Sequence, residues 1–131
     1  MASRTTSGKR MRSAAGFTLV ELLVVMAIIA ALTAFVAPGY LKQGDRAKET
    51  VLRHNLNTLR QSIDDYRADH GRNPESLDAL VERRYLREMP LDPVTGKRGS
   101  WLPRADEAGG VGDVKSGAKG RALDGTAYET W

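Results

Sequence analysis

The sequence FTLVELLVVMAIIAALTAFVA, at residues 17–37, decides the fold of this chain. Its only charged residue is Glu21, near the start of the run. A helix of this length, rising about 1.5 Å per residue, measures roughly 30 Å, which is the thickness of the hydrocarbon core of a bilayer. The run therefore predicts a membrane-spanning helix. What remains of the 131 residues is enough for one small domain.

The leader, residues 1–16, carries the excess positive charge of the chain. The whole chain has 20 Lys and Arg residues, 16 Asp and Glu residues and a formal net charge of +4. The leader contains no acidic residue, and its basic residues are Arg4, Lys9, Arg10 and Arg12. The chain without its leader is formally neutral. The basic character thus indicates membrane targeting with a cytoplasmic N-terminus, and it predicts no nucleic acid as a partner.

Two simpler explanations account for only part of this pattern. A secretory signal peptide has a shorter apolar region and an A-x-A cleavage site, whereas the alanines of the run, at positions 27, 30, 31, 34 and 37, never stand two residues apart. A plain signal anchor explains the length of the run but not Glu21. A carboxylate costs roughly 2.5–3.5 kcal/mol at the centre of a membrane helix, and less near its end.

A cut between Gly16 and Phe17 would give Glu21 a partner. The new α-amino group lies one helical turn from the carboxylate, which also faces the positive end of the helix dipole. The amine can neutralise Glu21 of its own chain, or it can pair with Glu21 of a neighbouring chain. The second arrangement fixes the register between helices in an apolar bundle.

Residues 16–29, GFTLVELLVVMAII, resemble the class III signal of type IV pilins and of type II secretion pseudopilins. Gly before the cut, Phe after it and Glu at the fifth mature position are all present. The resemblance implies that a membrane peptidase removes residues 1–16 by cleaving between Gly16 and Phe17. It also implies N-methylation of Phe17 and a role for Glu21 in assembly.

The second half of the predicted helix is amphipathic. Apolar residues recur at spacings of four, three, four and three, at Leu52, Leu56, Leu59, Ile63 and Tyr66. This narrow stripe predicts a helix face packed on a C-terminal domain. We expect one long helix over residues 17–71, whose first half, 17–37, forms the transmembrane or filament-core part.

Three residues mark features of this long helix and of the segment that follows it. Pro38 predicts a kink, because proline removes a backbone donor inside a helix. Gly71 predicts the end of the helix. Asn73 predicts the N-cap of a short second helix, which ends near residues 83–84.

Residues 72–131 predict a small globular domain. Weak strand signals at residues 100–102 and 111–114 flank Gly109 and Gly110, which suggests a hairpin. The rest of the tail predicts loop, with Trp131 packed back on the domain. The expected fold class is therefore α+β, with a long N-terminal helix, a short helix and a small antiparallel sheet.

No catalytic set stands out in the sequence, so we expect no enzymatic activity. His54 and His70 are expected on the surface of the helix, and the absence of cysteine excludes disulfides.

Residues 73–96 resemble the loop region of the major, G-type pseudopilin. That resemblance implies calcium in the C-terminal loop, with Asp124 and Asp113 as candidate ligands. The alternative for Asp124 is a simple turn with the glycine that follows it.

The resemblance implies a structural subunit of a type II secretion pseudopilus, which assembles through its apolar helix. The implied partners are further copies of this chain, other pseudopilins, the prepilin peptidase, and the inner-membrane platform with its ATPase. The implied location is the bacterial inner membrane, crossed once, with a periplasmic C-terminal domain, and then a periplasmic filament. The alternatives are a type IV pilin for adhesion or motility, and a membrane-anchored binding module.

Overall fold

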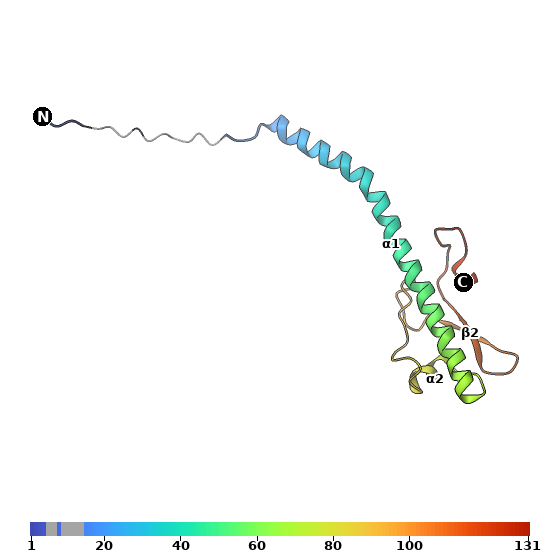
Figure 1. The fold of residues 1–131 in the computed structure, drawn as a ribbon. Helices are drawn as coiled ribbons and strands as arrows, with labels where there is room; N and C mark the ends of the chain where they lie inside the picture. Colours follow the sequence, from blue (N-terminus) through green and yellow to red (C-terminus); the bar gives the residue numbers. More distant parts are fainter. Residues whose placement is uncertain (5–7, 9–14) are drawn as a thin grey trace. The chain divides into compact units, whose positions relative to one another are not determined.

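The computed structural model describes residues 1–4, 8 and 15–131. In this part of the chain the elements follow in the order α1 (Leu19–His70), α2 (Leu77–Glu82), β1 (Leu102–Ala105), β2 (Val111–Lys115) and the 3-10 helix η1 (Tyr128–Thr130) (Figure 1). Two compact units are present, Met1–Pro38 and Gly39–Trp131. The predicted α+β class, with its long N-terminal helix, short second helix and small antiparallel sheet, is confirmed.

The first unit contains the beginning of α1. The helix starts at Leu19 rather than Phe17, because Thr18 is its N-cap. The Thr18 hydroxyl accepts the N–H of Glu21 at 3.1 Å, and the Thr18 carbonyl accepts the N–H of Leu22 at 3.1 Å. Pro38, at the end of this unit, lies inside α1. The kink at Pro38 remains a prediction.

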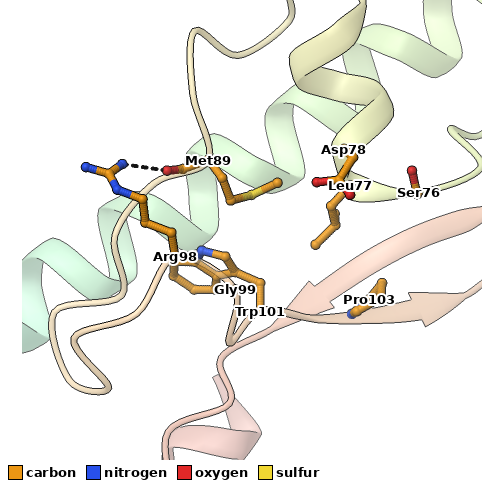
Figure 2. Close-up of a pocket in the computed structure, with 8 residues that line it drawn as sticks. All are labelled: Ser76, Leu77, Asp78, Met89, Arg98, Gly99, Trp101 and Pro103. Atoms are coloured by element: carbon orange, nitrogen blue, oxygen red, sulfur yellow. Dashed lines mark hydrogen bonds between the residues drawn. The ribbon is translucent and has the colours of Figure 1, made fainter.

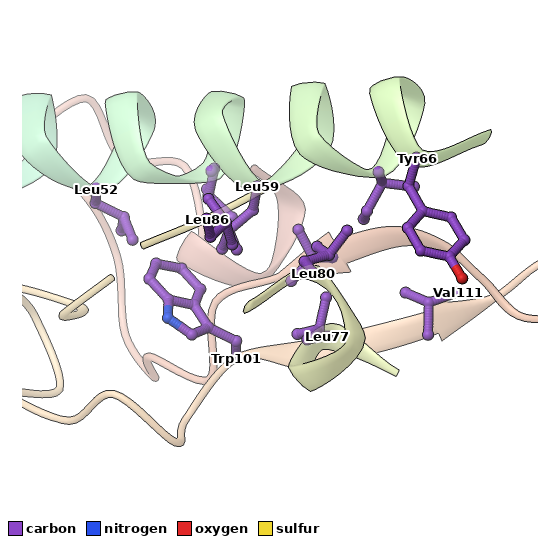
Figure 3. Close-up of a cluster of buried hydrophobic side chains, with 11 residues drawn as sticks. Leu52, Leu59, Tyr66, Leu77, Leu80, Leu86, Trp101 and Val111 are labelled. Carbon is purple, nitrogen blue, oxygen red and sulfur yellow. The ribbon is translucent and has the colours of Figure 1, made fainter. Parts of the chain in front are cut away.

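The second unit is built on the apolar stripe of α1 (Figure 3). All the predicted stripe residues are buried: Leu52, Leu56, Leu59, Ile63 and Tyr66. They form one core with side chains from α2, the loops and the hairpin, namely Leu77, Leu80, Leu86, Trp101, Val111 and Val114. Each fully buried side chain of this size contributes about 1.5–3 kcal/mol, so the stripe is the main support of the small domain.

We expect Leu59→Ala to destabilise the second unit by about 2–5 kcal/mol, because it leaves a cavity at a position that is 0% exposed. Thermal and chemical unfolding, followed by tryptophan fluorescence, would measure the loss. The matched control is Val51→Ala on the same helix, where the side chain is 46% exposed. Equal effects of the two substitutions would contradict the assignment of the core.

α2 begins later than the sequence predicts. Its N-cap is Ser76, whose hydroxyl accepts the backbone N–H of the residue three positions on, at 3.3 Å. The prediction of Asn73 as N-cap is therefore wrong. Asn73 is buried, and its amide group donates to Asp106 Oδ2 at 2.8 Å and to the Gly109 carbonyl at 2.9 Å, while its Oδ1 accepts from Arg67 Nε at 2.6 Å. Asn73 thus joins the end of α1 to the hairpin.

The predicted hairpin is present, and β1 and β2 pair antiparallel. The turn contains Gly109 and Gly110, with φ of 92° and 70°, which glycine adopts without strain. The first strand lies later than predicted, starting at Leu102. The reason is Trp101, whose side chain is buried in the core and whose Nε1 donates to the Pro90 carbonyl at 2.8 Å.

Asp92 is a buried carboxylate that the sequence analysis did not single out. It is 0% exposed. One of its oxygens accepts the N–H groups of Val94 at 2.8 Å and Thr95 at 3.2 Å, and the other accepts the hydroxyl of Ser116. These hydrogen bonds offset the cost of burying the group. They also tie the loop after α2 to the segment that follows β2.

An aromatic cluster closes the C-terminal end of α1. The ring of Tyr66 lies 4.2 Å from that of His70 and 5.4 Å from that of Tyr85, between centroids. The Tyr85 hydroxyl donates to Asp69 Oδ2 at 2.6 Å. This hydrogen bond, with smaller effects of desolvation and of the Asp69 charge, raises the pKa of Tyr85 from 10.0 to about 12.

We expect the contribution of the Tyr85 hydroxyl to stability to disappear in alkaline solution. Because the pKa of Tyr85 is higher in the folded state, the contribution is complete below pH 10 and is lost as the pH rises towards about 12. Chemical unfolding at several pH values would show a steeper decline for the wild type than for Tyr85→Phe. A decline of equal slope in the two proteins would contradict the account.

Candidate functional site

The predicted cleavage junction lies just before α1. Residues 15–18 are not helical, so Gly16 and Phe17 stand outside the helix. Phe17 is 85% exposed, and a Cβ added to Gly16 would meet no atom within 4 Å. Non-helical, uncovered backbone is what a peptidase needs in order to reach the bond. Of the leader's basic residues, Lys9, Arg10 and Arg12 lie outside the described residues.

Glu21 occupies the third position of α1, where its N–H is bonded to the Thr18 hydroxyl. Thr-x-x-Glu is the sequence pattern of a helix capping box, a signal that the sequence analysis missed. At this position the carboxylate is stabilised by the positive end of the helix dipole. Glu21 lines a small open hollow with Phe17 and Val25, which lie four residues before and after it. The site is therefore a carboxylate among apolar side chains, four residues after Phe17.

The helix of the first unit is apolar and uncovered. Every residue from 19 to 38 is exposed, including the large side chains of Leu23, Met26, Ile28 and Phe35. α1 is long and apolar enough to cross a membrane, and none of its most apolar window is buried. Monomeric soluble proteins rarely expose a continuous apolar surface of this size. The surface requires lipid or other apolar helices around it.

Asp113, one of the two candidate calcium ligands, pairs with an arginine of α1. Its Oδ1 accepts Arg60 Nε at 2.9 Å and the N–H of Val114 at 2.8 Å. The Arg60 guanidinium also donates to the carbonyls of Val114 at 3.1 Å and Trp131 at 2.8 Å. Arg60 thus holds β2 and the last residue of the sequence on α1.

Asp124, the other candidate, lies near a different arginine. Its Oδ1 accepts the N–H and the hydroxyl of Thr126 at 3.0 and 2.6 Å, and its Oδ2 lies 3.6 Å from the Arg53 guanidinium. The hydrogen bonds from Thr126, helped by the Arg53 charge, lower the pKa of Asp124. The turn that the sequence offered as the alternative is present, since the Gly125 N–H donates to the Ala122 carbonyl at 3.0 Å.

These residues do not fit a calcium site. Calcium takes six to eight oxygen ligands, usually with several carboxylates, whereas each candidate carboxylate has a guanidinium beside it. Over the described ranges, no three His, Cys, Asp or Glu side chains gather as a metal-binding group. Arg53 and Arg60 were not singled out from the sequence, although each pairs with one of the candidate aspartates. Arg53 and Arg60 follow Glu49 by four and eleven residues, so the three side chains lie within an arc of about 40° on the helix. This shared face was the available sequence signal that they act together.

A second hollow, of about 430 Å³, lies beside α2 and β1 (Figure 2). Leu77, Met89 and Trp101 contribute apolar surface to it, and Asp78 and Arg98 are its charged residues. Arg98 donates to the Met89 carbonyl at 2.7 Å and lies 3.5 Å from Glu88. The side chains that line this hollow offer no pairing of a nucleophile with a base.

An apolar N-terminal helix with a charge near its start, an exposed non-helical junction before it and a small α+β domain after it define a prepilin-type protein. Residues 11–37 match the family described as the prokaryotic N-terminal methylation motif. No solved structure matches the chain.

Named relatives place the chain more narrowly. It is 32% identical over 98 residues to the type II secretion system core protein G of Pseudomonas aeruginosa, which covers 63% of this chain and 69% of the relative. The corresponding protein of Vibrio cholerae is 31% identical over 100 residues, with coverages of 65% and 68%. The type IV wide pilus major component PilA4 of Thermus thermophilus is 41% identical over 71 residues, 54% of each chain. This chain belongs to the family of type II secretion system core protein G, the pseudopilins.

Proposed function

We propose that this protein is a structural subunit of a type II secretion pseudopilus, whose chemistry is assembly rather than catalysis. The observation that carries the proposal is the exposed apolar surface of residues 19–38 with a lone carboxylate, Glu21, near its start. A filament core made of such helices covers the apolar surface. It also gives every Glu21 a cationic partner if each chain begins with a free amine at residue 17.

Processing is the first step of the proposed function. The prepilin peptidase cleaves between Gly16 and Phe17 on the cytoplasmic side and thereby removes the basic leader, residues 1–16. Methylation of the new Phe17 amine keeps it cationic. The exposed, non-helical backbone at residues 15–18 supports this step.

Before assembly, the protein crosses the inner membrane once through residues 17–37. Basic residues concentrate before the span, whereas Lys42, Arg46 and Lys48 after it are mixed with Asp45 and Glu49. By the positive-inside rule, the N-terminus is cytoplasmic. The domain of residues 72–131 is then periplasmic.

In the filament, Glu21 of one subunit pairs with the Phe17 amine of the next. A buried charge in an apolar bundle is strongly destabilising unless its partner lies beside it. The pair therefore fixes the register between neighbouring helices. Pro38 marks the place where the helix can bend or unwind on assembly. The growing filament moves folded periplasmic cargo towards an outer-membrane channel, with other pseudopilins, the inner-membrane platform and its ATPase as further partners.

The alternative function is that of a type IV pilin, and the similarity to a type IV pilus component over 71 residues favours it. A pilin of this kind would use the same cleavage and the same Glu21 contact. The two functions differ in what is lost without the protein: export of periplasmic cargo in one case, and surface filaments with adhesion or motility in the other.

Deletion of the gene in its own bacterium tests the proposal. We expect exoproteins to accumulate in the periplasm, with surface filaments unchanged, and the plasmid-borne wild-type gene to restore export. Normal export together with lost filaments would reject the secretion function in favour of the pilin. Normal export and normal filaments would reject both and leave a membrane-anchored module.

A further inference from the structure

The last fourteen residues of the sequence, 118–131, form a loop-rich segment that we call the C-terminal strap. Besides η1, it contains a bridge between Arg121 and Ala127 and the turn at residues 122–125. The backbone hydrogen bonds of the strap, such as that from the Ala122 N–H to the Thr126 carbonyl at 2.7 Å, join its residues to one another. Side chains must therefore hold the strap on the rest of the domain. Small domains commonly stabilise such segments with a metal ion or a disulfide, and the chain has no cysteine.

Side chains of α1 bind the strap along one face of the helix. Glu49 accepts the N–H of Leu123 at 2.7 Å and the hydroxyl of Tyr128 at 3.2 Å. The Arg53 guanidinium lies 3.8 Å above the centre of the Trp131 ring, a cation–π contact. These contacts join one turn of the helix to the middle and the end of the strap.

Cationic side chains also donate to main-chain oxygen atoms of the strap. Arg60 and Lys115 Nζ both donate to the main-chain oxygen of Trp131, each at 2.8 Å. Arg121 donates to the Gly125 carbonyl at 2.9 Å. Together with the pairs Arg53–Asp124 and Arg60–Asp113, these donors place positive charge where calcium would need a set of free carboxylates and carbonyls. A divalent cation at either aspartate would meet a like charge.

We propose that the C-terminal strap is closed by this set of arginine and lysine contacts in place of a calcium ion, so that the stability of the second unit does not depend on divalent cations. This departs from the calcium site that the family resemblance implies. It concerns the stability of the domain and stands independently of the filament function.

The direct test is thermal unfolding of the full chain in detergent micelles, followed by tryptophan fluorescence, in EGTA and in excess calcium chloride at equal ionic strength. We expect the two melting temperatures to agree within about 1 °C. A calcium site filled at a hundred times its Kd would raise the melting temperature of a domain of this size by roughly 10 °C or more. A clear fall in melting temperature with EGTA would overturn the proposal.

A pair of variants tests the cationic contacts themselves. Arg60→Met keeps most of the volume of the side chain but removes its three contacts, and we expect the melting temperature to fall by about 5 °C or more, both in EGTA and in calcium. Arg46→Met, at an exposed arginine of the same helix, is the control and should change little. An Arg60→Met protein that unfolds at the wild-type temperature would also overturn the proposal. If this variant does not fold, the comparison of the wild-type melting temperatures in EGTA and in calcium still tests the proposal.

Discussion

Gly16→Leu is expected to stop removal of the leader. The bond that we propose is cut lies in non-helical backbone, where glycine adds no side chain between the peptidase and the Gly16–Phe17 peptide bond. A branched side chain at this position must fit the peptidase, whereas Gly16→Ala adds only a methyl group and should be tolerated better. We expect cleavage of Gly16→Leu to be slower by roughly tenfold or more, a loss of at least about 1.4 kcal/mol of transition-state stabilisation.

Immunoblots and intact mass of protein expressed with a prepilin peptidase would measure this effect. Gly8→Leu is the matched control, since a Cβ added to Gly8 also meets no atom within 4 Å. The Gly8→Leu protein should be cleaved like the wild type. Normal cleavage of Gly16→Leu would place the processing site elsewhere in the chain.

Glu21→Ala is expected to be cleaved and inserted into the membrane, but to assemble poorly. The backbone N–H at residue 21 still bonds to Thr18 in this variant, so the start of α1 is retained. What is lost is the partner of the Phe17 amine of the next subunit. Removing one partner of a buried ion pair costs about 3–5 kcal/mol, which corresponds to a hundredfold or larger loss at every subunit contact.

Electron microscopy and the fraction of sheared, sedimentable protein would report assembly. Glu21→Gln keeps the shape of the side chain but not its charge, and it should fail like Glu21→Ala. Val24→Ala, at an exposed apolar residue of the same helix, should assemble. Filaments of Glu21→Ala in wild-type amounts would instead support the use of the helix as a simple membrane anchor.

The parts of the fold that follow from local periodicity were predictable. The stripe from Leu52 to Tyr66 is buried as expected, because its spacing keeps the apolar side chains on one face of the helix. The C-terminal end of α1 was also predicted, from Gly71. In the structure the helix ends at His70, and Gly71 adopts a φ of 71°. These features depend on residues that lie within a few positions of one another.

The features that the sequence analysis missed depend on partners far apart in the chain. Asn73 has the local signal of an N-cap, but its amide is used by Asp106, 33 residues later. The role of Asp92 depends on Ser116, 24 residues away, and that of Arg60 on Trp131, 71 residues away. In each case the partner of the tertiary hydrogen bond lies too far along the chain to be identified from a local sequence pattern.

The central claim is that proteolysis creates the cation that makes Glu21 tolerable in an apolar helix bundle. Mass spectrometry of the N-terminal peptide of the protein isolated from its native membrane tests this claim most directly. The account predicts a chain that begins at N-methylated Phe17. A chain that begins at Met1 or Ala2, with the leader intact, would contradict it.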